Sequence, residues 1–368
     1  MKYRPTGRGD RMKRKSWHVL KPRVNTQIPR IIATIPVKSP VSNIVVNPVT
    51  NRVYFLQGDN DLSVLDGNTN KIIATLKTGQ LPFQMAVNTR TNRIYLVNFF
   101  DGTVSVINGR TNRIITTVKV GERCDEIALN SRTNLIYIAT ISLSSNKANV
   151  AVLNGSTNKI QKRIPFIGRP STISIDERTN RIYVTNTSKD TVSVIDGSTN
   201  NILTSVKVGR NPVITPALNT RTNRLYIANN LSRFCSVLDL LTNRIHNIQL
   251  GRLQSEITLN PVTNRIYVSS AQISVKGRMF VIDGRLDRVI RTLTIPSSTN
   301  MLINPRTNHL FITEFRETGA APLSVYNGSS LKRIAILRLT KRSGATVLNP
   351  QTSRVYSGGE TNITVIQD

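Results

Sequence analysis

The sequence has few of the residues that build metal centres, disulfide frameworks or membrane spans. Its 368 residues include two cysteines, Cys124 and Cys235, and three histidines, His18, His246 and His309. No histidine has a partner at metal-ligand spacing, and the cysteines fall in sequence repeats that would not be neighbours in a ring. The longest apolar runs fall short of the roughly 18 residues that a membrane helix needs. We therefore expect no disulfide, no metal site, no cofactor and no transmembrane segment.

A helical hydrophobic period is also missing, and one short turn followed by a strand recurs instead. Residues 260–268 (NPVTNRIYV) are the clearest copy, and the others begin at Asn47, Asn88, Asn130, Asp176, Asn219, Asn304 and Asn349. Successive copies start 41 to 46 residues apart. A period of about 40–45 residues of strand-like sequence is typical of a β-propeller with four strands in each blade. The sequence thus predicts an all-β, eight-bladed propeller of four-stranded antiparallel blades.

The two ends of the repeat array predict how the ring closes. The last copy stops at Asp368, where the third strand of a repeat normally ends. Residues 30–35 (RIIATI) match residues 71–76 (KIIATL), the fourth strand of the first repeat, but no strands one to three precede them. We therefore predict that an N-terminal strand completes the C-terminal blade, which removes an open sheet edge.

The chain divides into a basic tail and one propeller domain. Residues 1–28 are rich in Lys and Arg and are predicted to be disordered, whereas residues 29–368 hold the eight repeats. The tail lacks the apolar run of a secretory signal. We expect the protein to be cytoplasmic, or associated with a coat or envelope layer without a classical signal peptide.

The repeated turn and strand residues are interpreted as architecture. Turn Asn side chains can accept hydrogen bonds from their own backbone two residues on, and no copy gathers the several carboxylates of a calcium site. An aromatic residue follows in the second strand of every copy, and we predict that it packs between blades. These residues are Tyr54, Tyr95, Tyr137, Tyr183, Tyr226, Tyr267, Phe311 and Tyr356.

The strands resemble a known repeat family. Residues 92–98 (NRIYLVN), 181–186 (RIYVTN) and 192–197 (VSVIDG) are similar to the YVTN-type β-propeller repeat, and the resemblance covers residues 29–368. It implies a propeller fold and a binding scaffold, because such propellers serve varied partners. Many members have seven blades, whereas this chain has eight repeats.

Positive charge is abundant: 50 Lys and Arg against 20 Asp and Glu give a formal charge of +30. Cations follow the turns between strands one and two and between strands three and four, which lie at the same edge of a meander. The anion-binding candidates on this face are Arg52, Arg93, Arg181, Arg224, Arg265 and Arg354 after the first turn, and Lys71, Arg113, Lys159, Arg244 and Arg288 after the second. Such a surface attracts phosphate or carboxylate polymers. The alternative is that these are solvated strand ends, some paired with turn residues such as Asp66 or Asp239.

The opposite face carries the variable loops, where specific binding is common. Its candidates are Phe99, Phe100, Arg233, Phe234, Phe315 and Arg316 in the loops between strands two and three, and Arg123, Arg169, Arg210 and Arg252 in those between blades. Arginines beside exposed aromatic rings suit single-stranded nucleic acid. The aromatic residues could equally pack on neighbouring blades, and the arginines could simply face water.

Catalysis would need a general base or metal ligands at the ring centre. The acids of the variable loops look like solvating charges: Asp59, Asp61, Asp101, Asp190, Glu314, Glu317 and Glu360. We therefore predict a monomeric, non-catalytic scaffold that binds an anionic polymer, either single-stranded nucleic acid or an acidic cell-wall glycan. The alternative is a protein-binding or cell- or spore-surface scaffold whose charge is incidental. A lactonase-like or lyase-like propeller enzyme is less favoured.

Overall fold

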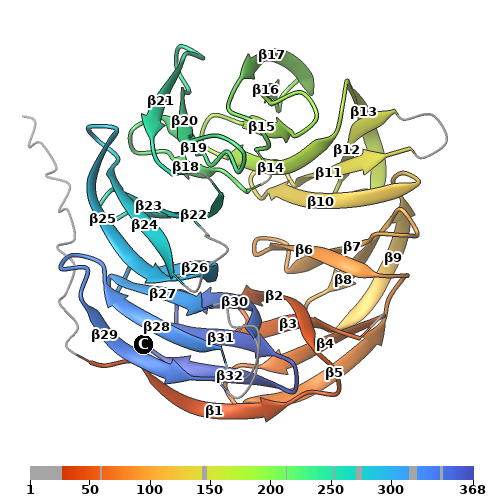
Figure 1. Ribbon diagram of the computed structural model, residues 1–368. Coiled ribbons are helices and arrows are strands. Elements are labelled where there is room, and N and C mark those ends of the chain that lie inside the picture. Colours follow the sequence, from red (N-terminus) through yellow and green to blue (C-terminus); the bar gives the residue numbers. More distant parts are fainter. Residues whose placement is uncertain are drawn as a thin grey trace, which may run out of the picture.

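The computed structural model describes residues 27–58, 60–142, 147–212, 214–251, 253–270, 276–314, 321–339 and 343–368. These residues form eight four-stranded antiparallel sheets around a common centre (Figure 1). The predicted eight-bladed propeller is confirmed. Within these residues no helix is long and apolar enough to cross a membrane. The predicted basic tail lies outside them, apart from its last two residues.

The blades follow one another along the chain. Blade 1 contains β2 (Val41–Asn47), β3 (Arg52–Gln57), β4 (Asp61–Asp66) and β5 (Lys71–Lys77), and blade 2 contains β6 (Pro82–Asn88), β7 (Arg93–Asn98), β8 (Thr103–Asn108) and β9 (Arg113–Lys119). Blade 3 contains β10 (Arg123–Asn130), β11 (Leu135–Ile141), β12 (Ala148–Asn154) and β13 (Lys159–Phe166), and blade 4 contains β14 (Pro170–Asp176), β15 (Arg181–Asn186), β16 (Thr191–Asp196) and β17 (Asn201–Lys207). Blade 5 contains β18 (Ala217–Asn219), β19 (Arg224–Ile227), β20 (Phe234–Asp239) and β21 (Ile245–Gln249), and blade 6 contains β22 (Gln254–Asn260), β23 (Arg265–Ser270), β24 (Lys276–Asp283) and β25 (Arg288–Pro296). Blade 7 contains β26 (Ser298–Asn304), β27 (His309–Glu314), β28 (Pro322–Asn327) and β29 (Arg333–Arg338).

Blade 8 joins the two ends of the propeller. It contains β30 (Ser343–Asn349), β31 (Arg354–Gly359), β32 (Asn362–Gln367) and, as its outermost strand, β1 (Arg30–Pro36). β1 pairs antiparallel with β32, with Arg30 opposite Gln367 and Pro36 opposite Asn362. The predicted closure by an N-terminal strand is therefore consistent with the sheet order β1-β32-β31-β30.

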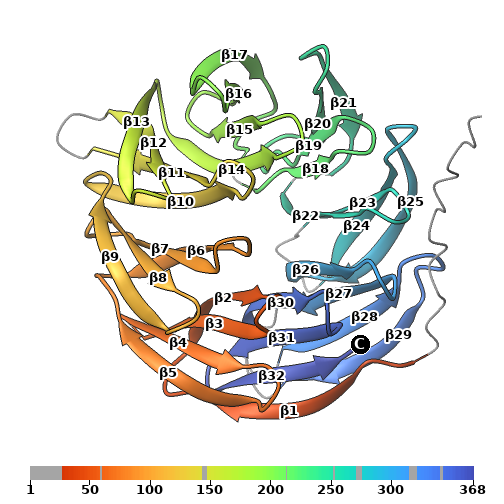
Figure 2. The ribbon, with the colours of Figure 1, turned by 180° about the vertical axis from the view of Figure 1, so that it is seen from behind.

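The first strand of each blade lies nearest the centre of the ring and the fourth lies at its circumference (Figures 1 and 2). Each meander places the one-to-two and three-to-four turns at one edge of the blade, which we call the turn face of the ring. The two-to-three loops and the connections between blades lie at the other edge, which we call the loop face.

The aromatic residue of each second strand packs between neighbouring blades, as predicted. All seven tyrosines and Phe311 at this position are almost fully buried. Tyr54 of blade 1, for example, packs with Met85 and Ile94 of blade 2. Burying large apolar side chains between blades supplies much of the stability of the ring, because a single blade has no closed core of its own.

Asparagines of the turn face form hydrogen bonds from each blade to the next. In blade 1, Asn47 Oδ1 accepts the Val49 N–H, as predicted, while its Nδ2 donates to Asn92 Oδ1 of blade 2 at 2.8 Å. The equivalent bonds are Asn88 to Asn134, Asn130 to Asn180, Asn219 to Asn264, Asn260 to Asn308, and Asn349 to Asn51. We call this set the asparagine ring.

The accepting asparagines have a left-handed backbone, such as φ 51° at Asn92, which Asn tolerates better than most residues. Each also packs on a turn glycine of its own blade. A Cβ at Gly109 would lie 2.2 Å from Asn92 Oδ1, so only glycine fits there. The repeated Asn and Gly therefore form one unit, which explains why the sequence repeats both.

Two positions depart from the asparagine ring. Blade 4 has Asp176 in place of the donor, and Arg178 bridges the gap by donating to Asn223 Oδ1 at 2.6 Å. Blade 8 has Ser353 in place of the acceptor, and Asn304 instead donates to Asp368 Oδ2 at 2.7 Å.

Candidate functional site

The arginines that begin the second strands make contacts between blades. Arg52 donates to the carbonyl oxygens of Gly109 and Arg110 and to Asn112 Oδ1, all in blade 2. The same contact with the next blade joins Arg93 to Gly155, Arg265 to Gly328, and Arg354 to Gly67. These guanidinium groups are half-buried and satisfy turn carbonyls, so they hold blades together.

The remaining two second-strand arginines form ion pairs. Arg181 Nη1 lies 2.6 Å from Asp196 Oδ2 of its own blade. Hydrogen bonds from the Ser198 backbone, together with Arg181, hold the pKa of Asp196 below its ordinary value. The alternative that some arginines pair with turn acids is thus correct here.

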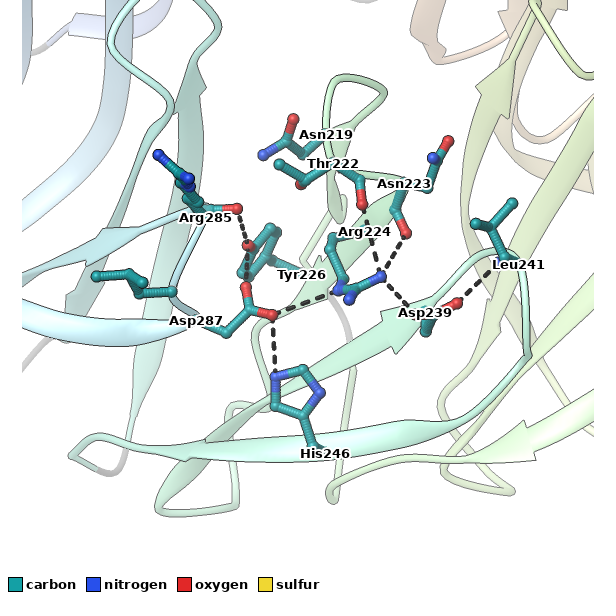
Figure 3. A network of polar contacts seen from close by, with 12 residues as sticks. Asn219, Thr222, Asn223, Arg224, Tyr226, Asp239, Leu241, His246, Arg285 and Asp287 are labelled. Atoms are coloured by element: carbon teal, nitrogen blue, oxygen red, sulfur yellow. Dashed lines mark hydrogen bonds and ion pairs between the residues drawn. The ribbon is translucent and has the colours of Figure 1, made fainter.

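Arg224 belongs to a polar network between blades 5 and 6 (Figure 3). It contacts Asp239 of its own blade and Asp287 of blade 6, whose carboxylate also accepts a hydrogen bond from the buried Tyr226 hydroxyl. His246 Nε2 lies 3.3 Å from Asp287 Oδ2. Burial, and then the hydrogen bond to Asp287, raise the pKa of Tyr226. The network joins two blades through a shared carboxylate.

The cations that follow the second turn lie at the circumference of the same turn face. Lys71, Arg113, Lys159, Arg244 and Arg288 are exposed and lie at or beside the starts of outermost strands. They belong to different blades and are therefore distributed around the circumference. Both predicted groups of cations thus lie at the turn face, but the second-strand arginines are engaged in contacts within the protein, whereas the second group is exposed at the circumference.

The loop face brings together aromatic and cationic side chains that the sequence separates. The Phe99 ring centroid lies 5.1 Å from that of Phe100 and 6.1 Å from that of Phe83. The guanidinium carbon of Arg123, from blade 3, lies 5.4 and 5.3 Å from the centroids of Phe99 and Phe100. Phe83 and Phe100 remain 48% and 51% exposed. We call these four residues the aromatic cluster.

The loop that carries the aromatic cluster is fixed by hydrogen bonds. The Phe99 N–H donates to the Leu81 carbonyl at 3.0 Å, and Asp101 Oδ2 accepts the Gln80 N–H at 2.7 Å. Gly102 has φ 57°, and a Cβ there would lie 2.1 Å from the Gly121 carbonyl oxygen. The exposed rings are therefore held in place before any ligand arrives.

The other predicted loop-face residues have separate environments. Arg169 pairs with Asp125 at 3.1 Å, Arg210 and Arg233 are exposed in blade 5, and Phe234 is half-buried at the start of β20. Arg252, Phe315 and Arg316 lie outside the described residues. Of the predicted candidates, the structure thus brings together Phe99, Phe100 and Arg123.

Several loop acids accept hydrogen bonds within the protein, so their prediction as solvating charges is wrong for these residues. Asp101 and Asp190 each accept a backbone N–H, and Glu314 accepts the Ser324 hydroxyl. Asp61 pairs with Lys77. Asp59 and Glu317 lie outside the described residues. These carboxylates shape the loops.

The sequence interpretation missed Phe83 and a set of polar residues on the inner strands. Asn43 and Gln84, each four residues before a turn Asn, form a hydrogen bond of 2.9 Å between blades 1 and 2. The same position holds Glu126 in blade 3 and Glu256 in blade 6. Burial raises the pKa of Glu126 to about 8 and that of Glu256 to about 7. Comparing the residue four positions before each turn Asn would have revealed that this position is often polar.

The histidines lie apart from the aromatic cluster. His246 and His309 are at the turn face, and His18 lies outside the described residues. Across the part of the chain that the structure describes, no group of three or more His, Cys, Asp or Glu residues could hold a metal ion.

Comparison with known proteins establishes the fold. No protein-family model matches the chain, and no curated protein sequence matches it. The resemblance to the YVTN-type repeat therefore stays a prediction. Among solved structures, dihydro-heme d1 dehydrogenase NirN in complex with DHE is similar, with a TM-score of 0.71 and 14% sequence identity. The similarity covers 84% of this chain and 68% of that chain.

The prediction of a non-catalytic scaffold for an anionic polymer is corrected. A protein with a similar propeller is named a dehydrogenase and was solved in complex with DHE, so the fold does not favour a scaffold without chemistry. In addition, the second-strand arginines are engaged in contacts within and between blades. At 14% identity the likeness concerns the fold alone, and the predicted absence of catalysis stays a prediction.

Proposed function

We propose that the protein binds a planar aromatic small molecule bearing carboxylates, and that the ligand docks on the aromatic cluster of the loop face. The observation that supports this proposal is the position of Arg123 over Phe99 and Phe100, beside two half-exposed rings. A soluble protein rarely fixes several large aromatic rings in an exposed position unless they meet a partner.

The chemistry of the aromatic cluster suits both parts of such a ligand. A flat π-system can stack on the rings of Phe83 and Phe100 or contact their edges. Aromatic rings prefer such offset or edge-to-face contacts. The guanidinium of Arg123 has donors left for a carboxylate at the edge of the ligand, because its contacts with the rings use its face. Together they select a ligand that is flat, apolar in its centre and negatively charged at its rim.

A haem-type macrocycle has this combination, and the similar propeller NirN was solved in complex with DHE. In the present chain, the described histidines lie at the turn face, away from the aromatic cluster. Stacking and charge therefore supply the binding, without an axial histidine from the described residues. Consequently, an iron-free porphyrin carboxylate should bind as tightly as haemin.

The test is an absorbance titration of the full chain with haemin and with protoporphyrin IX. We expect saturable binding of both with similar dissociation constants. Phe100→Ala and Arg123→Gln should each weaken binding about tenfold, since each removes a contact worth about 1–2 kcal/mol.

Leu241→Ala is the matched control for Phe100→Ala, because Leu241 is an exposed apolar residue of the turn face. Arg210→Gln is the control for Arg123→Gln, because Arg210 is exposed elsewhere on the loop face. Both should bind like the unaltered protein. Equal binding by all four variants, or no saturable binding of either macrocycle, would refute the proposal.

A further inference from the structure

The boundary between blades 4 and 5 lacks both contacts that repeat between other neighbouring blades, as does the boundary between blades 7 and 8, where Asp368 replaces them. Asp176 has no Nδ2 donor, so the asparagine ring is interrupted there. Arg181, which would reach the second turn of blade 5, pairs instead with Asp196 of its own blade. Blade 5 has Leu240 at the turn position where blades 1 to 4 have glycine. Both repeated inter-blade bonds are therefore absent at this boundary.

The inner strand of blade 5 is also short. β18 has 3 residues, whereas β14 of blade 4 has 7. Pro212 and Pro216 precede β18, and proline has no N–H to donate to a neighbouring strand. The sequence thus prevents the first strand of this blade from reaching its usual length, which reduces the packing of blades 4 and 5 near the ring centre.

Within the described residues, Asp190 of blade 4 accepts the N–H of Asn211 in the connection to blade 5, and two further side-chain hydrogen bonds replace the missing contacts. Arg178 Nη2 donates to Asn223 Oδ1 at 2.6 Å, and the Ser174 hydroxyl donates to the Pro216 carbonyl at 3.3 Å. The Arg178 side chain is 55% exposed, so water screens its contacts. An apolar cluster around Tyr183 and Leu225 remains the main contact between the two blades.

The two flanking boundaries are better connected. Between blades 3 and 4, Asn130 donates to Asn180 and the Tyr137 hydroxyl donates to Asn200. Between blades 5 and 6, Asn219 donates to Asn264, and Arg224 and Tyr226 meet on Asp287 (Figure 3). The boundary between blades 4 and 5 therefore has fewer contacts than the boundaries on either side of it.

We propose that the closed ring opens first at the boundary between blades 4 and 5. Sub-global opening follows the least connected part of a structure. When this boundary separates, the other contacts keep the blades together as an open ring, and the inner strands become accessible from the side.

Native-state hydrogen exchange of the full chain tests this directly. We expect amides of β15 and β19, which face each other across the boundary, to exchange faster than those of β7 and β11, the second strands of blades 2 and 3. Equal exchange of all four strands, or faster exchange in β7 and β11, would overturn the proposal.

Two substitutions should move the opening in opposite directions. Arg178→Ala should speed exchange in β15 and β19 about fivefold, because it removes the bridge to Asn223. Asp176→Asn should slow it by a similar factor, because it restores the donor that the other blades use.

Arg132→Ala is the matched control: Arg132 occupies the same turn position in blade 3, where Asn130 and Tyr137 also hold the boundary. If Arg132→Ala speeds exchange in β15 and β19 as much as Arg178→Ala does, the proposal is wrong.

Discussion

His309 Nδ1 lies 2.6 Å from Oδ1 of Asp368, the last residue of the chain, and neither side chain is exposed. Asp368 Oδ2 accepts further hydrogen bonds from Asn304 and from the Thr307 hydroxyl at 2.6 Å. The Asp368 side chain thus supplies the acceptor that an asparagine supplies at the equivalent of position 353 in other blades, and it completes the contact between blades 7 and 8. His309 occupies the position where every other blade except blade 3, which has Leu135, has an arginine.

Replacing Asp368 should therefore destabilise the ring. Asp368→Ala leaves the buried side chains of Asn304, Thr307 and His309 without their acceptor, and we expect a loss of about 3–5 kcal/mol in the free energy of unfolding. Urea denaturation measures this loss. Gln351→Ala, an exposed substitution in the same blade, should change the free energy by less than about 0.5 kcal/mol. An Asp368→Ala variant as stable as that control would contradict the proposed role.

The asparagine ring can be separated from local turn capping by two matched substitutions. Asn88 accepts the Arg90 and Thr91 N–H groups and also donates to Asn134, whereas Asn108 accepts only the equivalent pair, Arg110 and Thr111. Asn88→Ala should lower the free energy of unfolding by about 1–2 kcal/mol more than Asn108→Ala, because it also removes the inter-blade bond. Chemical denaturation of both variants gives the difference. Equal losses would mean that the bond between blades adds nothing.

Substitutions of Arg52 and Lys71 should distinguish a cation that stabilises the fold from one that is only solvated. Arg52→Ala should lower the free energy of unfolding by about 2–3 kcal/mol, since it leaves the blade 2 turn carbonyls without their charged donor. Lys71→Ala should change it by less than about 0.5 kcal/mol, because Lys71 is exposed on the outermost strand. Thermal unfolding of the two variants is the measurement. Similar stability of both would restore the interpretation of Arg52 as a free surface charge.

Stability should fall as the pH rises from about 4.5 toward about 8. In the unfolded chain, Glu126 and Glu256 lose their protons near the ordinary pKa of 4.5, whereas burial raises their pKa in the folded state to about 8 and about 7. In that window the folded state binds more protons than the unfolded state, so raising the pH favours unfolding. Above about pH 8 both states are deprotonated and the effect levels off.

Urea midpoints measured across this window test the effect. The double variant Glu126→Gln, Glu256→Gln should show a flatter pH dependence than the unaltered protein, because neither side chain titrates. The idea fails if the two profiles have the same slope.

The fold could be predicted because its signals are local and repeated. Each signal can be read within one repeat. The turn that begins at Asn260 marks a blade, the Tyr of each second strand marks its buried face, and the match between residues 30–35 and 71–76 marks a fourth strand. Alternation and turn chemistry therefore sufficed to give the blade number and the closing strand.

The candidate site could not be predicted in the same way, because its contacts join different blades. Arg52 looks like a solvated strand end until the carbonyl of Gly109, 57 residues later, is placed beside it. Phe83 follows a proline in an ordinary inner strand, and nothing local indicates that its ring meets Phe99. The sequence shows which residues carry chemistry, but only the closure of the ring shows which of them are already engaged.

The bonds of the asparagine ring run in one rotational sense, with the donor in one blade and the acceptor in the next, and Arg178 and Asn304 donate in the same sense at the two boundaries where the ring departs from Asn pairs. A free-standing blade, or any arc of blades, would end with an unmatched donor on one side and an unmatched acceptor on the other. Only a complete circuit leaves neither. The order of the blades around the ring therefore matters more than the blade in which the polypeptide starts. A circular permutant whose new ends fall in a loop-face connection should keep every one of these bonds.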